Sequence, residues 1–201
     1  MSYSDFTLKK IKDEFLLNLI ENEDLFSKIP EIQISDFLLN MLDYNVPLAM
    51  AIGTEKARSE FIIAHVLLEI RKMLSNKISL FSGVALDVDK EKGLTGFCDF
   101  VISKSPEQFY INAPIITIVE AKNEYIIGGL GQCIAEMYAS NIFNTKEGLL
   151  LPAVYGVVTT GTTWKFLKLE NNNAYIDLRE YYITNINKIM AIFMEIINQT
   201  E

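Results

Sequence analysis

The sequence predicts a mixed α/β fold, in which a central mixed β-sheet is flanked by helices in the order αβββαβ, with extra helices at the N-terminus. Residues 54–74 show the apolar spacing of an amphipathic helix, and five short apolar runs between residues 78 and 169 read as strands. A second helical pattern interrupts these strands at residues 131–143. With 201 residues and 50% hydrophobic content, a single domain over residues 1–201 is expected.

Residues 1–50 are predicted to form a helical N-terminal extension. Residues 6–26 and 34–42 carry apolar side chains at helical spacing, and Pro30 and Pro47 punctuate the pattern. The core is expected to begin after this extension and to cover residues 54–169.

The first core element is the helix over residues 54–74. Thr54 is a suitable N-cap, and Glu55 complements the positive end of the helix dipole. Residues 78–88 and 94–103 then form an antiparallel hairpin around a turn at 89–93.

A loop over residues 104–114 leads to the central strand at 115–121, which is followed by the helix at 131–143. Two further strands, at 153–159 and 163–169, pair around Thr160-Gly161-Thr162. Asn171-Asn172-Asn173 is a turn, and residues 182–198 form a closing helix.

Charged residues lie inside two of the predicted strands. Asp99 is embedded in the apolar run 96–102, and Glu120 and Lys122 end the central strand. Side chains alternate along a strand, so Glu120 and Lys122 are expected on one face, where Asp99 of a neighbouring strand can approach. Converging carboxylates repel each other unless a hard cation such as Mg²⁺ or Mn²⁺ binds between them.

With Asp99 on one strand and Glu120-Ala121-Lys122 on the next, residues 54–169 resemble the PD-(D/E)XK, or restriction-endonuclease-like, nucleases. Cys98 stands at the position of the signature proline, which many members of the superfamily also lack. The resemblance implies a restriction-endonuclease-like core and an Mg²⁺- or Mn²⁺-dependent nuclease, an endonuclease hydrolysing DNA phosphodiester bonds. It assigns Asp99, Glu120 and the backbone carbonyl of Ala121 to the metal, and Lys122 to the attacking water.

Two further residues follow from the same resemblance. Some branches carry a glutamine on the helix after the central strand, and Gln132 matches that position, although Glu136 stands where one branch has a tyrosine. The helix acid of the superfamily has two candidates, and Glu60 is favoured over Glu69 both for catalysis and as a possible metal ligand. The only histidine, His65, is interpreted as a packing or surface residue.

The net charge of −8 is unexpected for a nucleic-acid-binding protein, whose affinity comes largely from phosphate contacts. Residues 1–50 carry −5, residues 51–130 carry −1, and residues 131–201 carry −2. The near-neutral core is therefore expected to bind DNA through few contacts. The lysines chosen as candidate phosphate contacts are Lys104, Lys146, Lys165 and Lys168.

The charge also leaves alternatives open. It favours a nuclease subunit of a larger complex whose partner supplies DNA binding, whereas the family resemblance allows a homodimer that cuts both strands. A catalytically silent binding or assembly module is a third interpretation, and a metal-dependent enzyme with a different substrate is a fourth.

A cytoplasmic protein with no membrane partner is expected. No apolar run reaches the roughly 18 residues of a membrane span, and the first residues do not resemble a signal peptide. Cys98 and Cys133 lie in apolar segments without zinc-ligand spacing, so both are interpreted as reduced packing residues.

Overall fold

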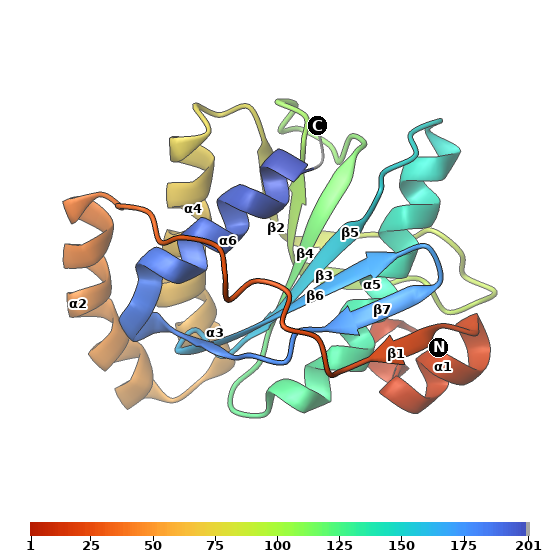
Figure 1. Ribbon diagram of the computed structural model, residues 1–201, viewed down its shortest axis with the longest axis horizontal. Coiled ribbons are helices and arrows are strands. Elements are labelled where there is room, and N and C mark those ends of the chain that lie inside the picture. The colour runs from red at the N-terminus through yellow and green to blue at the C-terminus, as the bar shows by residue number, and fades with distance from the viewer. Residues whose placement is uncertain (200–201) are drawn as a thin grey trace.

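The strand-forming runs pair into one eight-stranded mixed sheet in a computed structural model that describes residues 1–199 (Figure 1). The strands are β1 (Asn18–Ile20), β2 (Ser79–Ala85), β3 (Phe97–Ser103), β4 (Ile115–Ala121), β5 (Val154–Thr159), β6 (Thr163–Glu170), β7 (Asn173–Ile176) and β8 (Tyr181–Tyr182). Their spatial order is β1-β7-β6-β5-β4-β3-β2, with β8 added beside β6.

The pairs β4–β5 and β1–β7 are parallel, and the remaining pairs are antiparallel. The sheet is open and mixed, which confirms the predicted mixed α/β class.

Helices cover both faces of this sheet. They are α1 (Leu8–Phe15), α2 (Asp36–Ile52), α3 (Glu55–Arg58), α4 (Ala64–Met73), α5 (Ile126–Lys146) and α6 (Ile186–Gln199). A π-helical turn, Ser59–Ile63, joins α3 to α4, and short 3₁₀ turns occur at Tyr3–Asp5 and Ile183–Asn185.

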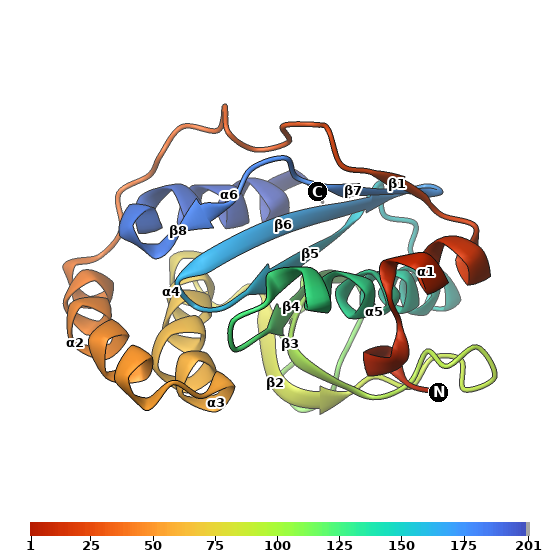
Figure 2. The ribbon, with the colours of Figure 1, turned by 90° about the horizontal axis from the view of Figure 1, so that it is seen from below.

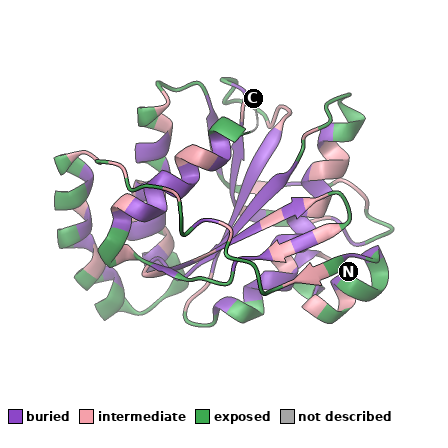
Figure 3. Ribbon diagram, in the orientation of Figure 1, coloured by how far each residue is buried: buried purple, intermediate pink, exposed green. Residues whose placement is uncertain are grey.

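Two hydrophobic cores lie on opposite faces of the sheet. One is closed by α4 and α6, and the other by α5 and α1 (Figure 1, Figure 2). The central strands β4 and β5 are buried along their whole length, as Figure 3 shows. Any charged side chain on β4 is therefore buried in the centre of the sheet.

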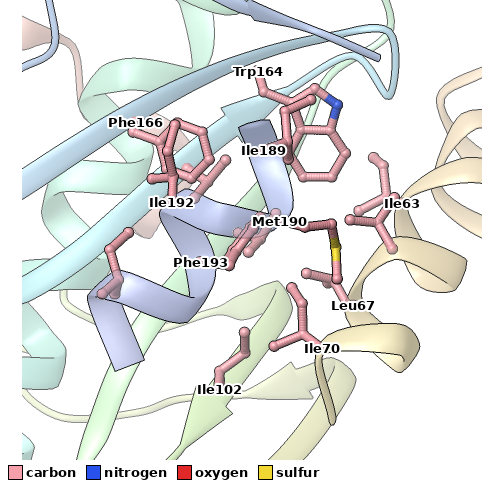
Figure 4. Close-up of a cluster of buried hydrophobic side chains, with 14 of the residues drawn as sticks. Ile63, Leu67, Ile70, Ile102, Trp164, Phe166, Ile189, Met190, Ile192 and Phe193 are labelled. Carbon is pink, nitrogen blue, oxygen red and sulfur yellow. The ribbon is translucent and has the colours of Figure 1, made fainter. Parts of the chain in front are cut away.

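Aromatic side chains fill the core beneath α6 (Figure 4). Trp164 and Phe193 meet edge to face at 5.9 Å between ring centroids, and Phe166 meets Phe193 at 5.3 Å. The indole N–H of Trp164 donates to the carbonyl of Gly161, 2.9 Å away, so the buried ring leaves no polar atom unpaired. Trp164 is therefore a packing residue of this core.

The N-terminal extension differs from the predicted pair of helices. Helix α1 ends at Phe15 because Leu16 adopts a left-handed conformation (φ 54°), and the chain continues as β1, which pairs with β7. Neither β1 nor β7 was predicted, since short edge strands carry little periodic signal. Pro47 lies inside α2 and does not interrupt it, because Leu42 and Ala49 on either side are held in the core.

Two helix starts also differ from the prediction. The closing helix begins at Ile186 after a 3₁₀ turn, and α5 begins at Ile126 rather than at residue 131. Gly129 lies inside α5, where the segment just after β4 passes very close to the helix. A Cβ at this position would lie 2.9 Å from the side chain of Lys122. Gly129 therefore marks the close approach of α5 to the segment after β4, and it does not form a turn that opens the helix.

Candidate functional site

An open cleft of about 430 Å³ lies where the helical segment 55–63 passes the ends of β2, β3 and β4. Four of its residues come from the helical segment and four from strands. They are Glu55, Lys56, Ser59 and Glu60, and Ser82, Gly83, Asp99 and Ala121. Asp99 and Ala121 were both assigned to the site from the sequence, and Glu60 was the favoured helix acid.

A local irregularity of the sheet turns Asp99 toward this cleft. In the register of β2 and β3, Gly83 stands opposite Asp99, and its φ of +61° is one that glycine adopts without strain. The β3–β4 ladder ends at the pair Phe100–Val119. The carboxylate of Asp99 takes the place of the next ladder bond by accepting from the backbone N–H of Ala121 at 2.8 Å.

Glu120 and Lys122 lie on the same face of β4, as predicted, and form an ion pair with 2.5 Å between Oε1 and Nζ. Glu120 is only 2% exposed, and its second oxygen, Oε2, has no hydrogen-bond partner within residues 1–199. The pair points toward α5, so its side chains lie behind the cleft while Ala121 between them lines it.

A row of side chains continues from Lys122 into helix α5. The Lys122 ammonium donates to Oε1 of Gln132 at 3.2 Å, and Nε2 of Gln132 donates to Oε1 of Glu136 at 3.0 Å. Glu136 is fully buried, and its Oε2 also lacks a partner within residues 1–199. Glu136 had been noted only as a departure from a family motif, although its i, i+4 spacing from Gln132 indicates a contact.

Burial and neighbouring charges shift the pKa values along this row. Burial and the charge of Asp99 raise the pKa of Glu120 above its ordinary value, although Lys122 opposes the shift. Burial lowers the pKa of Lys122, but the negative charges of Glu120, Glu55 and Asp99 together outweigh it and the net pKa is raised. Burial, followed by the charge of Glu120, raises the pKa of Glu136 well above the ordinary carboxyl range.

The helix acids that face the cleft are Glu55 and Glu60. Glu60 lies in the π-helical turn, is exposed, and pairs with Lys56 at 3.8 Å. Glu55 had been interpreted only as a dipole partner, yet it lines the cleft and its charge raises the pKa values of both Glu120 and Lys122. The other candidate, Glu69, is buried beside Lys72, and neither it nor His65 lines the cleft.

Arg58 is a second residue that the sequence did not single out. It is buried, and its guanidinium donates to Oδ1 of Asn123 at 3.2 Å and to the carbonyl of Thr160 at 3.0 Å. Through these two bonds, Arg58 connects the segment after Lys122 to the turn after β5. No sequence pattern marks this role, because the partners lie 65 and 102 residues away.

The four lysines proposed from the sequence as phosphate contacts do not line the cleft. Lys146 donates to the carbonyl of Val88, and Lys168 pairs with Glu170. The cation at the mouth of the cleft is Lys56, whose side chain is 82% exposed. Cys98 and Cys133 are buried and unpaired, in agreement with the predicted packing role.

No protein-family model matches this sequence, and no curated protein matches it. Within residues 1–199, no group of three or more His, Cys, Asp or Glu side chains is arranged to hold a metal ion. None of the helices in that range has both the length and the apolar content needed to cross a bilayer.

Proposed function

We propose that the protein is a metal-dependent nuclease with a restriction-endonuclease-like core that hydrolyses phosphodiester bonds in DNA. The observation that carries the proposal is the hydrogen bond from the backbone N–H of Ala121, which lies between Glu120 and Lys122, to the carboxylate of Asp99. Asp99 and Ala121 line a cleft together with two helix acids. The order of core elements, a helix, three strands, a helix and a strand, agrees with it.

The donor groups present suit a small divalent cation. Mg²⁺ commonly binds through one or two carboxylates, several waters and substrate phosphate, so a cluster of three acidic side chains is not required. Asp99, Glu120 and the carbonyl of Ala121 are the groups that would hold it. The unpaired, buried Oε2 of Glu120 supports this choice, because such an oxygen is costly without a partner.

Mg²⁺ or Mn²⁺, when bound, would supply charge stabilisation to the phosphate and acidify a bound water. Lys122 keeps one of its three N–H donors free of Glu120 and Gln132, and this donor can orient the water or a phosphate oxygen. Glu60, which lines the cleft from the helical segment, would be placed to accept a proton from a water bound there. Lys56 adds the positive charge that draws a phosphate to the cleft.

The net charge of −8 favours a second form of the proposal, in which a partner subunit supplies most of the DNA affinity. The same charge would suit a silent binding module. A pull-down with the intact protein tests for a partner subunit. Metal-dependent cleavage distinguishes a nuclease from a silent binding module.

The direct test is cleavage of duplex DNA by the full chain with Mg²⁺ or Mn²⁺. Asp99→Asn should abolish cleavage and weaken Mn²⁺ binding measured by calorimetry. Asp43→Asn is the matched control, because it removes the same charge from an exposed position on α2. Equal cleavage and equal Mn²⁺ affinity in the wild type and Asp99→Asn would overturn the proposal.

A further inference from the structure

Glu136 has no part in the chemistry described above, yet it is a carboxyl group buried completely in the face of α5 that packs on the sheet. Its sequence neighbours Ala135 and Met137 are apolar and equally buried. Burying a carboxyl group costs free energy unless its oxygens are satisfied, and Oε2 is not satisfied within residues 1–199. A hydrophobic side chain would pack here at lower cost, so the acid calls for another explanation.

The contacts of Gln132 provide that explanation. Its side-chain amide lies between the ammonium of Lys122, at 3.2 Å, and the carboxyl of Glu136, at 3.0 Å. An ammonium can only donate hydrogen bonds, whereas an amide has one accepting end and one donating end. The amide therefore satisfies Lys122 only when its oxygen faces the lysine.

An acceptor at position 136 selects this orientation. The NH₂ end of Gln132 then points at Oε1 of Glu136, an oxygen that can accept even when Oε2 carries a proton, and the flipped amide would set NH₂ against the Lys122 ammonium. Gln132 and Glu136 are one helical turn apart on α5, and helical side chains lean toward the N-terminus, which brings Glu136 back onto Gln132.

We propose that Glu136 is a positioning residue that orients the Gln132 amide and, through it, the ammonium of Lys122. Lys122 is then held between two acceptors, Glu120 and Gln132, and its third N–H is directed to one place. This inference rests on the proposed function for its effect on turnover, but the placement of Lys122 itself does not depend on any activity.

The test compares three variants of the full chain. Glu136→Leu removes the acceptor, Glu136→Gln keeps a side-chain oxygen in the same place, and Gln132→Leu removes the intermediate amide. Glu69→Leu is the matched control, because Glu69 is also a buried helix carboxyl but pairs with Lys72, not with Gln132. Each variant is first checked for folding by circular dichroism.

The first readout is the chemical shift of the Lys122 side-chain ¹³Cε at fixed pH, assigned by comparison with Lys122→Arg. We expect Glu136→Leu and Gln132→Leu to shift this signal, and Glu136→Gln to restore it to near its wild-type position. An unchanged signal in folded Glu136→Leu, or an equal shift in Glu69→Leu, would overturn the proposal. This readout stands even if the protein cleaves no nucleic acid, which would count against the proposed function alone.

The second readout is turnover in a double-mutant cycle. Loss of a residue that orients a functional side chain commonly costs about 10–100-fold, and we expect a loss of this size in Glu136→Leu with KM nearly unchanged. Since Glu136 acts through Gln132, adding Glu136→Leu to Gln132→Leu should cause no further loss. Multiplying losses in the double variant would show that Glu136 acts independently of Gln132 and would refute the proposed route.

Discussion

Beneath α6 the sheet buries Trp164, Phe166 and Phe193, whose rings meet edge to face, whereas beneath α5 it buries Glu120 and Glu136. Burial of aromatic surface stabilises the fold, while burial of carboxyl groups opposes it. The comparison teaches that the two faces differ in what they bury. The α6 face buries apolar and aromatic side chains that stabilise the fold, whereas the α5 face, which has an apolar core of its own, also buries two carboxyl groups at a cost in stability.

The largest expected effect breaks the α6 face. Trp164→Ala should lower the free energy of unfolding by about 3–5 kcal/mol, because it removes the largest fully buried side chain and leaves a cavity. Urea denaturation followed by circular dichroism measures it. Phe97→Ala is the control, since Phe97 is 72% exposed and its loss should change stability by less than about 0.5 kcal/mol. Similar values for the two variants would contradict the assignment of the α6 face.

The next effect concerns the α5 face and should appear in rate. Lys122→Ala should reduce turnover by about 10²–10³-fold, because a donor that stabilises developing charge is lost. Mn²⁺ affinity, measured by calorimetry, should change little. Lys168→Ala is a suitable control, since Lys168 pairs with Glu170 away from the cleft. If Lys122→Ala turns over at the wild-type rate, Lys122 is only a structural partner of Glu120.

A third prediction uses pH to measure the cost of burying Glu136. Burial raises the pKa of this carboxyl far above its ordinary value of 4.5, so the folded protein keeps a proton that the unfolded chain releases. Wild-type stability should therefore fall as pH rises above about 4.5, toward the folded-state pKa.

Glu136→Gln cannot ionise and should escape this loss. Its stability relative to wild type should rise by up to about 1.4 kcal/mol per pH unit in that window. Urea denaturation at pH 4 and pH 7 measures the change, with Asp43→Asn as an exposed control. A stability difference that stays constant or shrinks between the two pH values would show that Glu136 is ionised in the fold.

The smallest effect concerns the mouth of the cleft. Lys56→Ala should reduce the slope of log affinity against log salt by about 0.9, the value for one phosphate contact. Binding of a short duplex is measured across salt with Ca²⁺ in place of Mg²⁺. Lys146→Ala should leave the slope unchanged, because Lys146 donates to the carbonyl of Val88 and does not line the cleft. The reverse result would move the DNA-binding surface away from the cleft.

Much of the core could be predicted because its signals are local. The helix over residues 54–74, the hairpin strands and the strand 115–121 follow from apolar periodicity and strand propensity. The contact of Glu120 with Lys122 follows from the two-residue period of a strand, which needs no tertiary information. The extension was harder, since β1 gains its stability only from pairing with β7.

The sequence by itself determined the mixed α/β class and the side of β4 on which Glu120 and Lys122 lie. Only the tertiary structure decided that Glu55 joins Glu60 at the cleft, that Arg58 ties down the segment after Lys122, and that Gln132 links Lys122 to Glu136. The physical reason is the separation along the sequence over which each kind of interaction acts. Periodicity acts between residues a few positions apart, whereas these contacts depend on how helices settle on the sheet, which the packing of the whole core determines.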